Sequence, residues 1–366
     1  MDDMTTIPLI DGATLRSLVL PARADAGSDP HLRAYAEVRN LTFLETTGRD
    51  DDALSAEELL PILRSDEDTR RQQWCVERDG VVVGLALLAI RSDGGGQVAT
   101  WYLALRRSAQ GRGIAAAAYA RLEAVARSEG VRDLQLWTEQ PEEDGPRLVP
   151  PTGFGSIPRT RSARFLLRHG HVLEQVDRVS AFVWDAGSPA HLRALHADAQ
   201  QHAGGYRVVQ WALPTPPEHV DGYAWMKSRM STDAPTAGLS TPEETWDAER
   251  VARSDARFLD SGHDVLVTAA QHVPTGELAA FTELSLRLSE PAGVSHQEDT
   301  LVLAAHRGHR LGMLVKTAGL LAWRDRHPLS PRIVTYNAEE NRPMLSINEA
   351  IGYAPIGYDS AWKKTL

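Results

Sequence analysis

The sequence predicts a fold of mixed helices and strands that is built from two copies of one unit. A short turn rich in glycine and arginine occurs twice, as Gln110-Gly-Arg-Gly113-Ile-Ala115 and as Arg307-Gly-His-Arg-Leu-Gly312. Each copy follows an apolar stretch typical of a strand and opens an Ala/Leu-rich stretch typical of a helix. The copies begin 197 residues apart in a chain of 366 residues. A duplicated domain explains this spacing.

Composition and length agree with two soluble domains. A chain of 366 residues with 42% hydrophobic and 24% charged residues can build two cores. The single cysteine, Cys75, excludes an internal disulfide framework, and the chain has neither an apolar run of membrane-spanning length nor a signal-peptide pattern at its N-terminus. The net charge of −10 argues against nucleic acid as the main partner. We therefore expect a cytoplasmic protein, with neither a membrane nor a nucleic-acid partner.

The first half reads as an ordered series of strands and helices. Ser55 and Glu58 form a capping-box pattern, and Asp79-Gly80 is a strong hairpin signal. The expected elements are strand 16–20, helices 31–40 and 56–65, strands 74–78, 81–88 and 97–105, helix 111–128, strand 134–137, loop 141–158, helix 159–169 and closing strand 171–184. The helix at 111–128 has apolar residues at helical spacing and ends at Gly130.

The same order restarts after a linker at 185–189. The expected elements are a connecting helix 190–202, strand 206–213, helices 218–231 and 243–261, strands 264–272, 277–288 and 298–304, helix 308–326, strand 332–336, helix 341–351 and closing strand 353–363. Gly170 and Gly352, which end the last helix of each half, are only 182 residues apart, and loop 141–158 accounts for the extra length of the first half. We therefore divide the chain into domains 1–186 and 187–366.

Each glycine-rich turn is a predicted anion site. A strand, a turn and a helix N-terminus present free backbone N–H groups, and the helix dipole favours negative charge. A plain strand-to-helix connection is the simpler alternative. A dinucleotide fingerprint, Gly111-x-Gly113-x-x-Ala116, is disfavoured because polar residues 106–110 separate it from the strand and the second copy lacks it. Neither turn contains the Gly-Lys-Ser/Thr of a P-loop.

The element order and the Gln/Arg-x-x-Gly-x-Gly/Ala turns resemble the GNAT N-acetyltransferase superfamily. The whole chain resembles its tandem arrangement, as in mycothiol synthase and related actinobacterial acetyltransferases. Gln110, Gly113 and Ala115 match the turn fully, whereas Arg310 stands where the second turn would have its middle glycine. The resemblance implies an α+β fold of two tandem GNAT domains, each with a mixed, splayed central sheet flanked by helices.

The resemblance also implies that these turns hold the pyrophosphate of acetyl-CoA, which would be the co-substrate. On the splayed strand, backbone groups would pair with the pantetheine arm, at 301–303 in the second half and 104–106 in the first. The implied coenzyme-binding residues are Leu301, Val302, Leu303, Arg307, Gly308, His309, Arg310, Leu311, Gly312, Asn337 and Asn341, together with Gln110, Gly111, Arg112, Gly113 and Ala115. The two asparagines equally suit helix capping.

Amine acetylation requires a deprotonated amine, and in this family a general base commonly lies early on the splayed strand. The second half offers Glu298 and Asp299 there, and the first half offers only residues 98–100, which are Val-Ala-Thr. We therefore assign catalysis to the second half and prefer Asp299, with Glu283 in reserve. The alternative is that both strand carboxylates are solvated edge residues.

The family's usual thiolate acid is a tyrosine on the last helix. Asn348 occupies this position in the second half and Leu166 in the first. Asparagine can donate a hydrogen bond but no acidic proton. Either solvent protonates the thiolate, or Tyr336 or Tyr353 serves as the acid.

The resulting prediction is an acetyl-CoA-dependent N-acetyltransferase that acts on a primary amine of a small molecule by direct transfer. We expect no metal, because the histidines lack a zinc-site spacing, and a monomer or homodimer. A mycothiol-synthase-like enzyme, an antibiotic-modifying enzyme and a non-catalytic acyl-CoA sensor are the alternatives.

Overall fold

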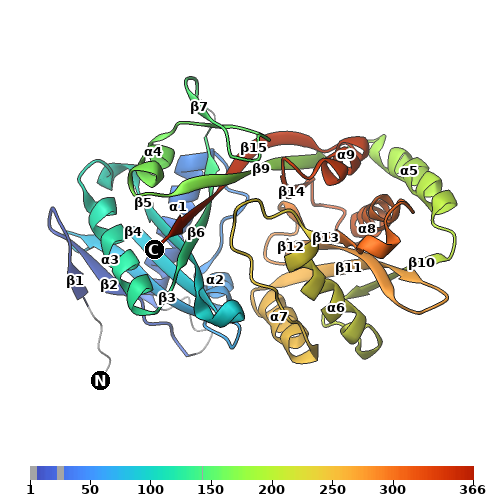
Figure 1. Cartoon of the computed structure of the whole chain (residues 1–366), viewed down its shortest axis with the longest axis horizontal. Coiled ribbons are helices and arrows are strands. Elements are labelled where there is room, and N and C mark those ends of the chain that lie inside the picture. The colour runs from blue at the N-terminus through green and yellow to red at the C-terminus, as the bar shows by residue number, and fades with distance from the viewer. Residues whose placement is uncertain (1–5, 23–28, 142) are drawn as a thin grey trace.

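The computed structural model describes residues 6–22, 29–141 and 143–366 as two lobes joined by one continuous sheet (Figure 1). The N-terminal half contains β1 (Thr6–Pro8), β2 (Ala13–Ser17), α1 (Pro30–Thr47), α2 (Ala56–Leu63), β3 (Thr69–Arg78), β4 (Val81–Arg91), β5 (Val98–Leu105), α3 (Ile114–Ser128), β6 (Asp133–Gln140), β7 (Arg147–Leu148), β8 (Ile157–Pro158), α4 (Arg161–Arg168) and β9 (Val172–Val183). The predicted α+β fold of two repeated units is confirmed.

The C-terminal half repeats this order after one additional helix. It contains α5 (Ser188–His202), β10 (Tyr206–Ala212), α6 (Pro217–Asp233), α7 (Ala248–Asp260), β11 (His263–His272), β12 (Leu278–Arg287), β13 (Ser295–Val302), α8 (Leu311–Arg326), β14 (Arg332–Ala338), α9 (Arg342–Ile351) and β15 (Ala354–Thr365). No helix in the described ranges is long and apolar enough to cross a membrane.

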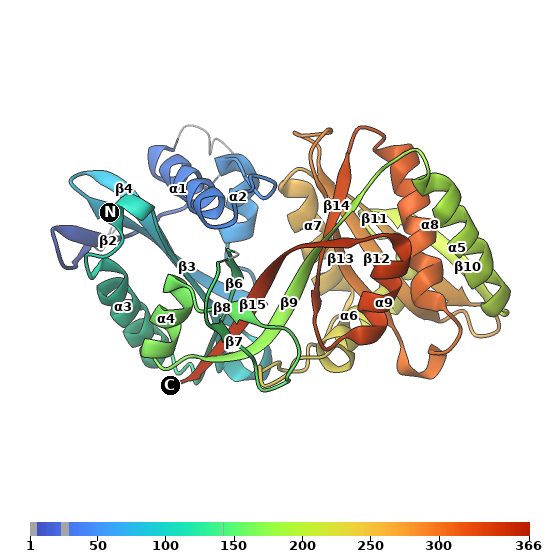
Figure 2. The ribbon, with the colours of Figure 1, turned by 90° about the horizontal axis from the view of Figure 1, so that it is seen from above.

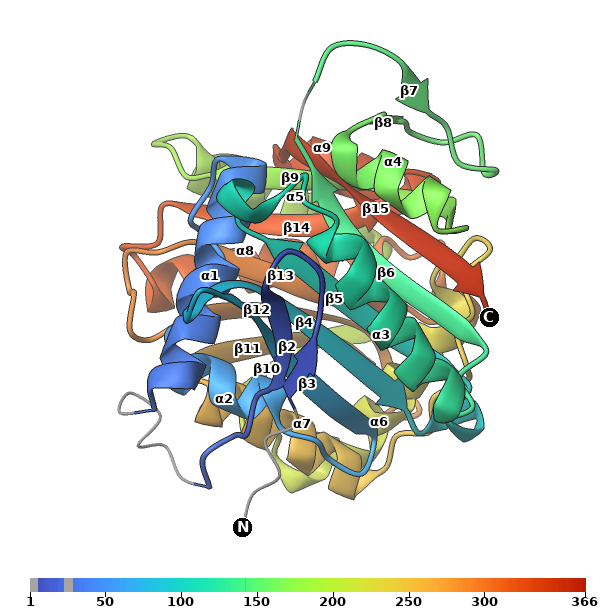
Figure 3. The same ribbon diagram turned by 90° about the vertical axis from the view of Figure 1, so that its left-hand side faces the viewer.

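The closing strands of the two halves are exchanged. The sheet order is β1-β2-β3-β4-β5-β6-β15-β9-β14-β13-β12-β11-β10. The last strand of the chain, β15, pairs with β6 of the first half, and β9 pairs with β14 of the second half. Figure 3 shows β15 running beside β6. The predicted domain boundary at residue 186 lies between β9 and α5. Because β9 pairs with β14 and β15 pairs with β6, the residues on the two sides of this boundary share one hydrogen-bonded sheet.

Helices cover both faces of the sheet. In the N-terminal half, α1 and α2 lie on one face and α3 and α4 on the other (Figure 2). Separate clusters of buried residues fill the two sides: Leu32 and Leu60 belong to the cluster under α1 and α2, and Tyr119 and Leu122 belong to the cluster under α3. Both helical layers therefore bury an apolar stripe against the sheet.

Several helix boundaries have a local cause. The predicted capping box at Ser55 and Glu58 is present at the start of α2. Helix α3 begins at Ile114 instead of 111, because Gly111 and Gly113 have φ values of 82° and 80°. Such left-handed conformations suit a turn and not a helix. Helix α7 begins at Ala248, after the N-cap residue Asp247, so residues 243–247 of the predicted helix lie outside it.

Candidate active site

Both halves contain a pair of parallel strands that separates after three residues. Strands β5 and β6 pair over 98–100 and 133–135, and β13 and β14 pair over 295–297 and 333–335. Beyond these points the backbone of each pair diverges. In both halves the first residue of the turn caps the end of the splayed strand, since Gln110 Nε2 lies 2.9 Å from the Leu105 carbonyl oxygen and Arg307 Nε lies 3.3 Å from that of Val302.

The two turns also share their backbone conformation. Gly111 and Gly308 have φ values of 82° and 89°, and Gly113 and Arg310 have φ values of 80° and 54°. Arg310 therefore adopts the same left-handed conformation as Gly113, the residue at the equivalent position of the first turn. The duplication inferred from the sequence thus extends to individual dihedral angles.

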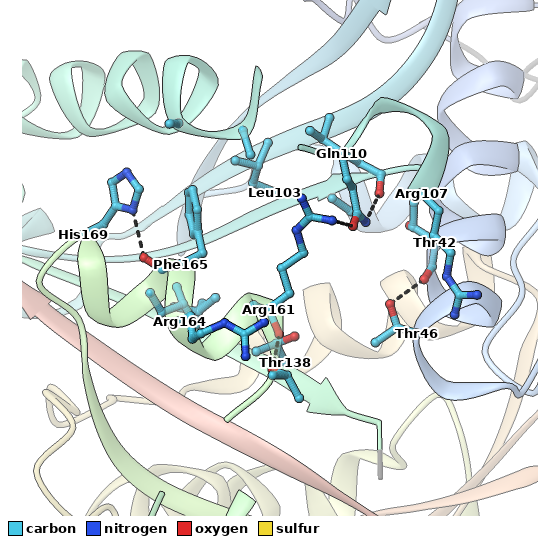
Figure 4. Close-up of a pocket in the computed structure, with 18 of the residues that line it drawn as sticks. Thr42, Thr46, Leu103, Arg107, Gln110, Thr138, Arg161, Arg164, Phe165 and His169 are labelled. Carbon is cyan, nitrogen blue, oxygen red and sulfur yellow. Dashed lines mark hydrogen bonds between the residues drawn. The ribbon is translucent and has the colours of Figure 1, made fainter. Parts of the chain in front are cut away.

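A cavity of about 970 Å³ lies beside the N-terminal turn. It lies between α3 and α4, and Figure 4 shows Arg161 reaching across it toward Gln110. Of the predicted coenzyme-binding residues, Gln110, Gly111, Gly113 and Ala115 line it, as do Ala104 and Leu105 of the splayed strand. Arg112 is directed away, toward Asp11, at 3.5 Å.

Positive charge is concentrated at the α4 side of this cavity. Arg161, Arg164 and Arg168 all line it, and their spacing of three and four residues places them on one helix face. Arg107 lines it from the turn. The N–H groups in the first turn of α3 have no carbonyl partner within that helix. These donors suit a ligand with several phosphate groups, such as coenzyme A.

The cavity passes through the sheet. Its lining includes Thr42, Glu45 and Thr46 of α1, which covers the face opposite α3 and α4. In Figure 4 the α1 threonines lie on the other side of the cavity from Phe165. The divergence of β5 from β6 provides the opening, so one ligand could approach from each face.

The C-terminal half has a different arrangement at the equivalent place. Helix α5 packs along α8 and α9: His191 Nε2 lies 2.8 Å from the Ala350 carbonyl oxygen, His196 Nδ1 lies 3.1 Å from Thr317 Oγ1, and Leu192 is fully buried. At the positions equivalent to Arg161, Arg164 and Arg168, helix α9 has Pro343, Ser346 and Ala350.

The predicted turn residues of this half contact protein groups. A Cβ atom added at Gly312 would lie 2.9 Å from Ile347 Cδ1. Arg310 forms an ion pair with Asp198 of α5, the rings of His309 and Tyr206 lie 5.3 Å apart, and Leu311 is buried. Gly308, like Arg307, is exposed. The two arginines of this turn contact protein groups, Arg307 the Val302 carbonyl oxygen and Arg310 the Asp198 carboxylate.

The splayed strand of each half is paired on one side within the sheet. In the N-terminal half Arg106 donates its N–H to the Val83 carbonyl oxygen at 2.9 Å and Ala104 lies opposite Leu85. In the C-terminal half Leu303 donates its N–H to the Ala279 carbonyl oxygen at 3.0 Å and Leu301 lies opposite Phe281. Only Val302, between them, directs its backbone groups toward the opening, where Arg307 contacts its carbonyl oxygen.

The predicted base residues take part in ion pairs and hydrogen bonds. Asp299 and the reserve candidate Glu283 both contact Lys227 Nζ, at 2.5 and 3.2 Å. Glu298 accepts a hydrogen bond from Ser285 Oγ at 2.6 Å. Tyr102 and not a carboxylate stands at the position equivalent to Asp299 in the first half.

The amide candidates contact protein groups as well. Asn348 donates a hydrogen bond to Asn337 Oδ1 at 2.6 Å, while the Asn348 Oδ1 atom is buried without a partner. Asn341 caps α9 by accepting from the Met344 N–H at 3.4 Å, which is the alternative role expected for it.

Of the two candidate acids, Tyr353 is buried and donates a hydrogen bond to Gln297 Oε1 at 2.8 Å. Tyr336 is 39% exposed and donates to Glu139 Oε1 of the other half at 2.7 Å. The pKa of each tyrosine is raised, mainly by desolvation. Tyr336 therefore lies at the junction of the halves, whereas the hydroxyl of Tyr353 is bonded within the C-terminal half.

The arginines of α4 were missed from the sequence, although a signal existed. Their spacing is visible in Arg161-Ser-Ala-Arg164, just after the Pro/Gly-rich loop. The α4 arginines distinguish the halves more sharply than the strand carboxylates do, because helix α9 has no arginine at the equivalent positions.

Comparison with known proteins agrees with this geometry. Residues 35–147 match the acetyltransferase (GNAT) family, and no curated protein sequence matches the chain significantly. The fold is similar to that of a tandem GNAT protein from the clavulanic acid biosynthesis pathway, with 22% identity, a TM-score of 0.70 and coverage of 96% of this chain and 98% of the other.

Two further structures share the fold. A GCN5-related N-acetyltransferase from Sphaerobacter thermophilus has 14% identity, a TM-score of 0.62 and coverage of 98% and 97%. N-myristoyltransferase from Saccharomyces cerevisiae, with bound myristoyl-CoA, has 10% identity, a TM-score of 0.57 and coverage of 98% and 81%. Residues 35–147 thus match the model of the GNAT acetyltransferase family, and the chain as a whole has the fold of a tandem GNAT protein.

Proposed function

We propose that the protein is an acyl-CoA-dependent N-acyltransferase that holds its coenzyme in the cavity of the N-terminal half. The observation that carries the proposal is the cavity itself, because it joins an arginine-rich mouth at α4 to the opposite face of the sheet through the strand opening. The segment that matches the GNAT family, 35–147, forms most of its walls. This proposal places the coenzyme in the half opposite to the one preferred from the sequence.

The chain's residues suit such a ligand in three ways. The α4 arginines and the α3 amides would bind phosphate groups. The outward backbone groups of Leu103, on the splayed strand, would pair with the amides of the pantetheine arm. Acyl-CoA supplies an activated thioester.

In the reaction, a bond forms between the amine nitrogen and the acyl carbon and the carbon–sulfur bond breaks. The nitrogen loses a proton and the thiolate gains one. Holding the two reactants at opposite ends of one opening supplies proximity. A small-molecule amine as acceptor and a cytoplasmic location belong to the same proposal, while mycothiol-type and antibiotic acceptors remain predictions.

A second candidate, a protein that binds acyl-CoA without catalysis, has one observation in its favour. The family's acid position is Leu166 in this cavity, and Leu166 has no donor. Release of free thiol from acetyl-CoA with a panel of primary amines separates the two functions. Tight binding of CoA without thiol release from any amine would support the sensor.

Paired variants decide which half binds the coenzyme. The double variant Arg161→Glu and Arg164→Glu should weaken CoA binding at least 30-fold in calorimetry, because it places two negative charges where phosphates would lie. The matched control, Arg307→Glu, changes the C-terminal turn and should leave the affinity within about twofold. The opposite pattern would return the coenzyme to the C-terminal half.

A further inference from the structure

A row of carboxylates crosses the middle of the sheet, where the closing strands are exchanged. Glu139 of β6 lies directly opposite Asp359 of β15, and Asp359 lies directly opposite Asp177 of β9. Residues directly opposite one another in antiparallel strands project from the same face, about 5 Å apart. We call Glu139, Asp359 and Asp177 the carboxylate row.

The carboxylate row lies on the α1 face, at the acceptor end of the cavity. Arg49, which follows α1, binds both carboxylate oxygens of Glu139, at 2.6 and 2.8 Å. Thr46 of α1, three residues before Arg49, lines the cavity on this face, whereas Thr138 lines it from the opposite face of β6. The row therefore lies on the α1 side of the strand opening and extends toward the C-terminal half.

The inner part of the row lacks a neutralising cation. Asp177 receives no hydrogen bond or ion pair from any described residue, and burial and the nearby Glu340 and Glu339 raise its pKa to about 7. The Oε2 atom of Glu340 is itself buried without a partner. Among the described residues, Asp359 accepts hydrogen bonds only from backbone N–H groups, and burial next to Asp177 raises its pKa well above the usual value. Unpaired carboxylates at such positions are costly unless a cation or proton compensates them.

Two aromatic side chains flank the row. Trp137 precedes Glu139 by two residues, so it projects from the same face, and it is 38% exposed. Tyr336 donates its hydroxyl hydrogen to Glu139. Exposed aromatic faces beside carboxylates are typical of sites that bind ammonium groups.

We propose that the acyl acceptor is a small amine with at least two positive charges, whose non-reacting ammonium group binds to Asp359 and Asp177. This inference rests on the proposed function. One amine would lie near the cavity and lose its proton to react, while the second stays charged and positions the molecule along the row. Neighbouring strands lie about 5 Å apart, which is comparable to the separation of two amino groups on a chain of three or four carbon atoms.

Three primary amines with the same four-carbon chain test the inference with the full-length protein and acetyl-CoA. We expect kcat/KM for 1,4-diaminobutane to exceed that for 1-aminobutane and for 4-amino-1-butanol by about 100-fold, which corresponds to about 2.7 kcal/mol. Similar values for all three amines would overturn the inference and leave the proposed acyltransferase in place.

Variants locate the second charge. The double variant Asp177→Asn and Asp359→Asn should lower kcat/KM for 1,4-diaminobutane at least 10-fold and leave that for 1-aminobutane within about twofold. The control, Asp260→Asn with Asp325→Asn, makes the same change in net charge at exposed positions elsewhere and should change neither. Equal losses for both amines in the row variant would contradict the proposed positioning role.

Calorimetry with 1,4-diaminobutane in the absence of acetyl-CoA separates binding from transfer. Binding by the wild type that is lost in the row variant, without acetylation of any amine, would keep the cation site and overturn the proposed function. Acetylation of simple amines without any binding of 1,4-diaminobutane would overturn the cation site and keep the proposed function.

Discussion

The ammonium group of Lys227 lies 2.5 Å from a carboxylate oxygen of Asp299, the residue that the sequence favours as the general base. Lys227 on α6 also contacts the buried Glu283 at 3.2 Å, and Tyr223 donates a hydrogen bond to Glu283. Desolvation alone would lower the pKa of Lys227, but the two carboxylates outweigh it and hold the pKa well above its usual value. The carboxylates that the sequence suggested for catalysis therefore form a closed ion cluster.

Lys227→Met should destabilise the protein strongly. Glu283 would remain buried without its cation, and breaking a buried ion pair by removing one partner typically costs about 3–5 kcal/mol. Urea unfolding at pH 7.5 would measure the loss. Adding Glu283→Gln should recover part of it, because no uncompensated carboxylate then remains at that position. A loss below about 1 kcal/mol for the single variant would show that solvent reaches the cluster and screens it.

Asp299→Asn tests the same cluster against the role expected from the sequence. Under the proposed function, kcat/KM should remain within about twofold at every pH, since transfer takes place in the other half. A general base would instead give a rate loss that is largest near neutral pH and recovers toward the pKa of the amine. A pH–rate profile of the variant distinguishes the two, and recovery at high pH would return catalysis to the C-terminal half.

Arg310→Gly should stabilise the protein slightly or leave it unchanged. Arg310 has a φ value of 54°, which costs a residue with a Cβ about 1 kcal/mol. Its ion pair with Asp198 is about half exposed on both sides and contributes less than about 1 kcal/mol. Arg310→Ala is the matched control, because it removes the ion pair and keeps the Cβ. Thermal unfolding should place the glycine variant about 1 kcal/mol above the alanine variant, and equal stabilities would contradict a strained turn.

The sequence was sufficient for the fold because its signals are local. The repeated turn, the capping box at Ser55 and the hairpin at Asp79-Gly80 each depend on neighbouring residues. The exchange of β9 and β15 was not predictable in this way, because the sequence of a strand does not specify its neighbour, and strands of the other half supply partners for both. The order of strands in the centre of the sheet is decided by packing between the halves.

The candidate site likewise contains residues that local sequence patterns predicted and residues that only the tertiary structure brings together. Gln110, Gly111, Gly113 and Ala115 lie at the cavity as the turn pattern indicated. The carboxylate row joins residues 139, 177 and 359, which only the strand exchange brings together. Tertiary packing likewise decides whether a turn is open to a ligand or covered. Helix α5 packs beside the second turn, although the sequence of α5 indicates only an ordinary connecting helix.

Lys316 gives a pH-dependent test of the C-terminal core. It is fully buried on α8, and its Nζ lies 2.7 Å from Gln297 Oε1, which also accepts the Tyr353 hydroxyl. Burial lowers the pKa of Lys316 to about 7 from 10.5. The folded state therefore holds fewer protons than the unfolded state between these values, so its stability should rise with pH across this range, by at most about 1.4 kcal/mol per pH unit.

Lys316→Met removes this dependence and keeps the volume of the side chain, while Gln297 keeps its bond from Tyr353. The variant should therefore be more stable than the wild type near pH 6.5, and its advantage should shrink steadily as the pH rises from 7 toward 9.5. Parallel urea titrations of the two proteins isolate Lys316, since every other titrating group is common to both. A difference that stays constant from pH 6.5 to 9.5 would show that the Lys316 amine keeps its proton in the folded protein.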